Sequence, residues 1–198
     1  MSAKDLVKAI LSSDESRFNE IATPESSLEA ATFKNAHVGA IRIHTVDAEN
    51  TEWEACLFDG TTFDGISLQG AFFNGCSFHH CTFKNAILAE ASFDGCVWLR
   101  STITEAEDLE AIELTNCQFK ECEFSDLHFV DGTLESLTFS AGTLRNLSGI
   151  AQLKSVALRG VDVESFDTSE MTIASCTASS CTNIPKGFTA SEGKRRRV

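Results

Sequence analysis

The sequence has no long hydrophobic stretch and no secretory signal at its N-terminus. The apolar residues near the start are interrupted by Lys4, Asp5 and Lys8, and no stretch approaches the length of about 20 apolar residues that a membrane-spanning helix needs. A glycine-rich phosphate loop, a nucleophile elbow and a zinc-protease motif are also missing. We therefore expect a cytoplasmic protein that is not an enzyme and has no cofactor.

Positive charge is scarce. The chain has 16 lysines and arginines against 29 acidic residues, for a formal net charge of −13. The four basic residues at 194–197 contribute +4, so the rest of the chain carries −17. Such a balance argues against direct binding of nucleic acid through its phosphates and allows a basic protein partner. Solubility alone is the alternative explanation.

The eight cysteines do not indicate a disulfide scaffold, because disulfide-dense domains are much shorter than this chain of 198 residues. Their spacing has a different explanation, which follows from an internal repeat. We expect free thiols.

Apolar residues recur every five positions. All sixteen residues at this spacing from 28 to 103 are apolar, which chance would produce roughly once in a million for a fixed phase. The residue two positions before each is mostly small, and glycine recurs two positions after. The sixteen are Leu28, Phe33, Val38, Ile43, Ala48, Trp53, Phe58, Phe63, Leu68, Phe73, Phe78, Phe83, Leu88, Phe93, Trp98 and Ile103.

A period of five fits neither a helix nor a flat strand. A helix would distribute these residues around its surface, and a strand would alternate them between two faces. A chain that turns a corner every five residues keeps them all inside, and glycine at one phase suits a corner with positive φ. Four corners close a square coil of about 20 residues, and stacked coils pair like the strands of a sheet.

Three segments carry a specific resemblance to a known family: 76–80 (CSFHH), 81–85 (CTFKN) and 91–95 (ASFDG). Each reads as a small residue, a polar residue, a phenylalanine and two variable residues. This pattern resembles the pentapeptide-repeat family, and the resemblance covers about 28–183. It implies an all-β solenoid, a right-handed quadrilateral parallel β-helix of about eight coils, without enzyme activity.

Two breaks in the phase and two distinct ends divide the chain. The ladder shifts by one residue within 104–108 and loses its step again at 145–152. Leu6, Val7, Ile10 and Leu11 share a helical face, so we expect a helical cap over 1–24. The β-helix should then span 25–184, and a C-terminal cap with a basic tail should follow at 185–198. The later ladder positions are Leu109, Leu114, Phe119, Phe124, Phe129, Leu134, Phe139, Leu144, Leu153, Leu158, Val163, Thr168, Ile173 and Ala178.

The cysteines follow the coil. Cys56, Cys76 and Cys96 recur once per coil, and Cys117 joins them after the one-residue shift. We expect them inside one wall, about 4.8 Å apart, as small core residues, because stacked rungs cannot converge tetrahedrally on a metal ion. His79 and His80 lie between two cysteines, but the repeat phase turns both histidines outward. No metal site is therefore expected. With the phenylalanines at 58, 63, 73, 78, 83, 93, 119, 124 and 129, these four cysteines form the expected core.

Acidic residues are concentrated between 105 and 135, where Lys120 is the one opposing cation. Isolated apolar residues at outward positions can also mark an interface. The candidate partner-binding residues are Glu105, Glu107, Asp108, Glu110, Glu113, Glu121, Glu123, Asp126, Asp131, Phe72 and Ile87.

Two functions remain open. The family that this sequence resembles includes quinolone-resistance proteins that mimic DNA and bind DNA gyrase, which implies gyrase or topoisomerase IV as a partner. The alternative is a structural or scaffolding module that binds an unrelated protein. An end-to-end homodimer is a further expectation. The distinguishing feature is whether the acids gather on one face or encircle the rod.

Overall fold

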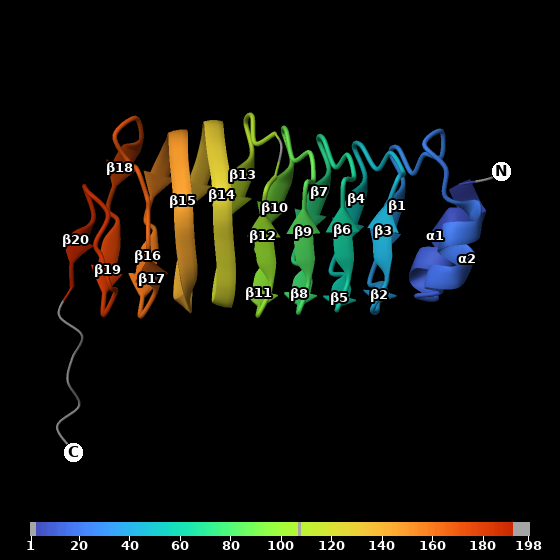
Figure 1. The fold of residues 1–198 in the computed structure, drawn as a ribbon, viewed down its shortest axis with the longest axis horizontal. Coiled ribbons are helices and arrows are strands. Elements are labelled where there is room, and N and C mark those ends of the chain that lie inside the picture. Colours follow the sequence, from blue (N-terminus) through green and yellow to red (C-terminus); the bar gives the residue numbers. More distant parts are fainter. Residues whose placement is uncertain (1–2, 107, 192–198) are drawn as a thin grey trace, which may run out of the picture.

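The computed structural model describes residues 3–106 and 108–191 of the 198-residue chain. Two short helices, α1 (Ala3–Leu11) and α2 (Glu15–Ile21), precede a rod of stacked coils (Figure 1). The rod is a right-handed β-helix of about seven turns, and all its strand pairs are parallel. The expected fold class is confirmed. The expected eight coils become eight rungs on one wall, from Phe33 to Ile173, which enclose about seven full turns.

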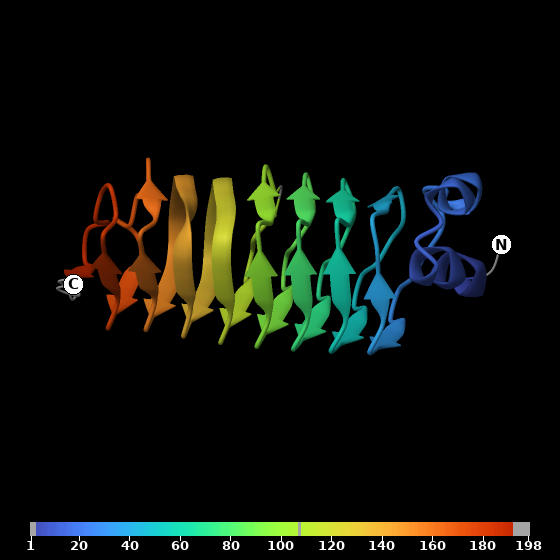
Figure 2. The ribbon, with the colours of Figure 1, turned by 90° about the horizontal axis from the view of Figure 1, so that it is seen from below.

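The coils have four walls, and short strands form three of them (Figures 1 and 2). The first wall holds β1 (Thr32–Lys34), β4 (Glu52–Glu54), β7 (Phe72–Asn74), β10 (Ser92–Asp94), β13 (Glu113–Thr115) and β18 (Thr172–Ala174). The second holds β2 (His37–Val38), β5 (Leu57–Asp59), β8 (Ser77–His79), β11 (Val97–Leu99), β16 (Ala157–Arg159), β19 (Thr177–Ser179) and β20 (Thr189–Ala190). The third holds β3 (Arg42–His44), β6 (Thr62–Asp64), β9 (Thr82–Lys84), β12 (Thr102–Thr104) and β17 (Asp162–Val163).

Two longer strands and a series of single bridges complete the coils. β14 (Gln118–Glu135) and β15 (Thr138–Lys154) continue round the corners and connect the walls. The fourth wall is held by isolated parallel bridges, of which Ile87–Asp108 and Glu110–Val130 are two. It is drawn as loops along the top of Figure 1.

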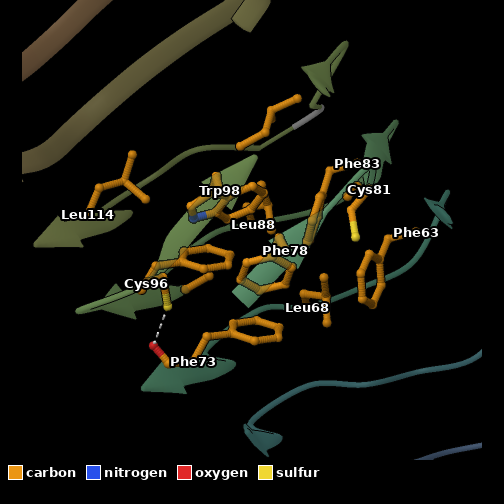
Figure 3. Packing of buried hydrophobic residues seen from close by; sticks show 14 of the residues in the cluster. Phe63, Leu68, Phe73, Phe78, Cys81, Phe83, Leu88, Cys96, Trp98 and Leu114 are labelled. Carbon is orange, nitrogen blue, oxygen red and sulfur yellow. Dashed lines mark hydrogen bonds between the residues drawn. The ribbon is translucent and has the colours of Figure 1, made fainter. Parts of the chain in front are cut away.

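The residues at the five-residue spacing fill the axis of the rod. All sixteen from Leu28 to Ile103 are buried, and their aromatic rings stack from coil to coil (Figure 3). The ring centroids of Phe33 and Trp53 are 3.7 Å apart, and those of Phe63 and Phe83 are 4.4 Å apart. Because every coil buries its own apolar residues on those of the next, the hydrophobic core is continuous along the rod.

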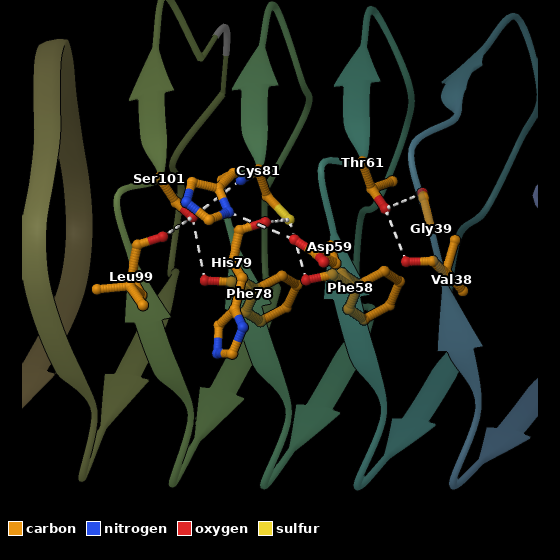
Figure 4. A network of polar contacts seen from close by, with 11 residues as sticks. Val38, Gly39, Phe58, Asp59, Thr61, Phe78, His79, Cys81, Leu99 and Ser101 are labelled. Carbon is orange, nitrogen blue, oxygen red and sulfur yellow. Dashed lines mark hydrogen bonds and ion pairs between the residues drawn. The ribbon is translucent and has the colours of Figure 1, made fainter.

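Small polar residues before the central positions connect neighbouring coils by hydrogen bonds. The Cys76 thiol donates to the Trp53 carbonyl at 3.3 Å, and the Ser101 hydroxyl donates to the Phe78 carbonyl at 3.1 Å. Thr61 and Cys81 make equivalent bonds in the wall shown in Figure 4. Buried thiols and hydroxyls therefore have acceptors, as buried polar groups require.

The corners need a left-handed backbone at a fixed position. Gly60 and Gly75 adopt φ values of +74° and +60°, as the sequence pattern predicts. Asn35, Asn85 and Asn116 occupy equivalent corners with φ between 50° and 56°. Asparagine tolerates this region better than most residues, so glycine alone does not mark the corners.

The register changes at both expected breaks. Ile87 pairs with Asp108 on the fourth wall, so the coil between them has one residue more than the earlier coils. Further along, Phe129 pairs with Gly149 and Gly132 pairs with Ala151, so one residue is lost between these two rungs. At Gly149, where φ is +106°, an added Cβ would lie 2.1 Å from the Phe129 carbonyl oxygen. This close backbone contact requires glycine.

The two helices cover the first coil. Ile10 of α1 and Phe18 and Ile21 of α2 are buried against it, and the Ser13 hydroxyl accepts a 2.6 Å hydrogen bond from the Gly39 N–H of the first coil. At the other end Phe188 is buried and Ile173 is half-buried. The basic tail at 194–197 lies outside the described residues. No described helix is long and apolar enough to cross a membrane.

Candidate functional site

The acidic candidates do not share one wall. Glu113 projects from the first wall and Glu123 from the third, while Glu121 occupies the corner between the second and third walls. Glu107 lies outside the described residues. The remaining acidic candidates lie on the fourth wall or at its edges: Glu105, Asp108, Glu110, Asp126 and Asp131.

Several acids on the first three walls have basic partners from a neighbouring coil. Arg100 contacts Glu121 at 2.7 Å, and its hydrogen bond and charge lower the pKa of the Glu121 carboxyl. Arg145 contacts Glu123 at 2.5 Å. Within the segment 105–135 the sequence shows only one lysine, Lys120. The arginines that contact Glu121 and Glu123 are about one coil away along the chain, so the segment by itself does not reveal them. Lys154 likewise contacts Glu135, and Lys84 contacts Glu105.

The fourth wall carries acids and no lysine or arginine over its described segments, 27–30, 47–50, 67–70, 87–90, 108–111, 128–131, 148–150 and 166–170. We call this face, with the corner acids Glu105 and Asp126, the acidic wall. Its remaining acids are Glu29, Asp47, Glu49, Glu90, Asp108, Glu110, Asp131, Asp167 and Glu170.

Backbone and hydroxyl groups help to hold some of these carboxylates. Asp108 accepts the Glu110 N–H at 3.0 Å, and Asp47 accepts the Glu49 N–H at 2.9 Å. At the C-terminal end, the backbone N–H and hydroxyl of Ser169 lower the pKa of the Asp167 carboxyl. These local bonds orient the carboxylates, and those from Ser169 favour the charged form of Asp167.

The repeats that build these walls match a known family model. The model described as "Pentapeptide repeats (9 copies)" matches residues 58–103. The chain carries pentapeptide repeats. The family suggested by the sequence pattern is therefore confirmed.

Solved structures of other pentapeptide-repeat rods are similar over most of their length. A trypsin-treated variant of QnrB1, a plasmid-mediated fluoroquinolone resistance protein, is 13% identical with a TM-score of 0.49, over 85% of this chain and 92% of that one. HetL, a pentapeptide repeat protein involved in heterocyst differentiation regulation from the cyanobacterium Nostoc sp. strain PCC 7120, is 11% identical with a TM-score of 0.29, over 96% of this chain and 94% of that one. No curated protein matches the chain.

The cysteines of the pentapeptide repeats are structural in position. Cys56, Cys76, Cys96 and Cys117 are buried on consecutive coils, and burial raises the pKa of the nearby Cys81 thiol to about 12. His80 points outward, with its Nδ1 3.4 Å from the Asp59 carboxylate. Within the described part of the chain, no three His, Cys, Asp or Glu side chains come together as a metal site.

The outward apolar residues of the pentapeptide-repeat rod lie on different walls. Phe72 is 40% exposed on the first wall, which adjoins the acidic wall, and Ile87 is half-buried on the acidic wall. Val130 and Ile150 are also exposed on the acidic wall, although the sequence reading did not select them. Residues on the same wall recur about every 20 positions, so this longer spacing in the sequence would have predicted the wall of each of these apolar residues.

Proposed function

We propose that this pentapeptide-repeat rod is a protein-binding module, not an enzyme, and that a basic surface of its partner docks on the acidic wall. The observation that supports the proposal is the segregation of charge. The other three walls carry bases that contact acids from neighbouring coils, whereas the acidic wall carries no lysine or arginine between 27 and 170, and bases approach it only at its edge (Lys84 on Glu105) and at its C-terminal end (Lys186 near Asp167). A face of one sign attracts a surface of opposite sign and accelerates its association.

The partner that we propose to test first is a type II topoisomerase, DNA gyrase or topoisomerase IV. A protein that mimics DNA must present charge at the spacing of phosphates, about one per 3.4 Å of each strand. Coils about 4.8 Å apart place roughly one acid per 3–4 Å along the acidic wall, in three groups separated by coils without acids. This spacing supports mimicry of one strand, with protection of the enzyme from inhibitors as the biological role.

The same charge argues against direct binding of nucleic acid, which the acidic wall would repel. The eight free thiols, seven of them buried, are consistent with a reducing compartment, and we propose a cytoplasmic location.

The experiment compares two variants that each remove three negative charges. The wall variant carries Asp108→Asn, Glu110→Gln and Asp131→Asn. The control variant carries Glu121→Gln, Glu123→Gln and Glu135→Gln, which lie off the acidic wall. We expect the wall variant to bind gyrase or topoisomerase IV about tenfold more weakly, with a smaller dependence on salt, and the control to bind like wild type.

Supercoiling and quinolone-induced cleavage assays measure the functional effect of each protein on gyrase. If wild type leaves both reactions unchanged at all concentrations, the topoisomerase proposal is wrong. Capture from the source cytosol then tests the broader proposal. A basic protein retained by wild type and control but lost with the wall variant supports a scaffold with another partner. Equal capture by all three would show that the acidic wall is not the docking face.

A further inference from the structure

An apolar patch interrupts the acidic wall in its C-terminal half. Val130 and Ile150 are 37% and 49% exposed, and each directly follows one member of the paired residues Phe129 and Gly149. They therefore lie side by side on neighbouring coils. Glu110 forms a bridge with Val130 on the preceding coil, and Asp131 follows Val130 at the corner. Two exposed apolar side chains are thus bordered by carboxylates.

The outer face of α1 has the complementary chemistry. Val7 is half-buried and Leu11 is 42% exposed, and they line a shallow depression together with Lys4, Lys8 and Ser12. The opposite face of α1 is buried on the first coil, so no other element of the described chain covers this outer face. Here two apolar side chains are bordered by two lysines.

We propose that the outer face of α1 in one copy of this chain docks on the patch of Val130 and Ile150 in a second copy. Apolar contacts would cover the two partly exposed apolar side chains of each surface, four in all, and Lys4 and Lys8 would face Glu110 and Asp131. The proposal concerns the same wall as the proposed function but does not depend on it. A bound copy would compete with any other partner for this face.

The position of the two surfaces determines the kind of assembly. α1 lies at the N-terminal end of the rod, and the patch lies on its side, several coils away (Figure 1). The contact is therefore head-to-side and joins two different surfaces, unlike an end-to-end homodimer. Each added copy leaves one surface of each kind free, so association is open-ended and increases with concentration.

Sedimentation velocity of the purified full chain over a concentration series, at low and high salt, measures this association. Leu11→Asp removes the α1 surface and Ile150→Glu removes the wall surface. Each should weaken association at least tenfold, because apolar contact is lost and a charge is introduced. Val97→Glu, at another exposed valine on the second wall, is the control and should associate like wild type.

An equimolar mixture of the two defective variants gives the decisive result. Leu11→Asp retains an intact wall and Ile150→Glu retains an intact α1, so the mixture should form one-to-one dimers that cannot extend. Circular dichroism confirms that both variants remain folded. Wild type that stays monomeric up to its solubility limit would overturn the proposal, and so would a mixture that remains monomeric.

Discussion

Replacement of Phe78 by alanine tests the inward phase of the whole repeat. Phe78 is at the centre of β8 and has no exposed surface. Its ring stacks between those of Phe58 and Trp98, with centroid distances of 4.9 and 4.1 Å, and contacts Phe73 and Phe83 edge-on at 5.6 Å each. Alanine would leave a cavity lined by rings on several sides (Figure 3).

The size of the effect follows from that environment. Truncation of a buried phenylalanine costs about 3–5 kcal/mol through lost transfer energy and the cavity that remains. Each aromatic pair adds about 0.5–1.5 kcal/mol beyond burial, so we expect the upper part of the range. Since a folded domain is stable by about 5–15 kcal/mol, this single change would remove a large share of the total.

Phe72→Ala is the matched control, because it removes the same atoms from an outward position that is 40% exposed. We expect it to cost under about 1 kcal/mol. Denaturant titration followed by far-ultraviolet circular dichroism gives both free energies of unfolding, and the slope of each titration shows whether the rod still unfolds as one unit. If the two variants lose similar stability, the assignment of inward and outward positions is wrong.

Three further predictions concern other features of the rod. Gly142→Ala should be strongly destabilising in thermal melts, because its Cβ would lie 2.1 Å from the Cys122 carbonyl oxygen. Gly65→Ala, with φ of +60° but no atom within 4 Å of the added Cβ, should cost only the strain of a left-handed alanine, about 1–2 kcal/mol. Trp98→Phe should cost less stability than Trp53→Phe in denaturant titration, because the buried Trp98 indole N–H finds no acceptor among the described residues while that of Trp53 donates to Thr51. Elemental analysis should find no stoichiometric metal, and all eight cysteines should react as thiols after unfolding; one zinc or iron per chain would contradict this.

The residues that fill the core of the rod could be predicted from the sequence, because their inward orientation depends on a local rule. A corner every five residues turns each central side chain inward, whatever the neighbouring coil contains. The break near 104–108 was visible for the same reason, since it moved the apolar phase by one residue. The left-handed corners were only partly visible, because residues such as Asn35 and Asn85 adopt the conformation that glycine marks elsewhere.

The arrangement of the outward side chains on the four walls could not be predicted from a continuous segment of the sequence. Acids that are neighbours in sequence, such as Glu121 and Glu123, project from a corner and from the next wall, and each contacts a base from another coil. Asp108 and Asp131, separated by more than a coil of sequence, lie on the same face. Charge on such a rod has to be compared between positions one full coil apart, with a correction of one residue at each break. The segment 105–135 therefore contains only some of the acids of the acidic wall, together with residues of the other three walls.

The separation of inner and outer positions indicates that the acidic wall contributes little to folding. The core is built from central residues and small residues, so exposed carboxylates on any wall contribute little to stability. Solubility requires negative charge but does not require that bases be absent from one face, and acids distributed evenly would serve it equally well. On the first three walls, acids and bases do alternate between coils, as Arg100 and Glu121 show. Selection for contact with a basic surface, as proposed above, would account for a wall without lysine or arginine while bases are retained on the others. The comparison of charge-matched variants on and off the acidic wall measures this difference directly.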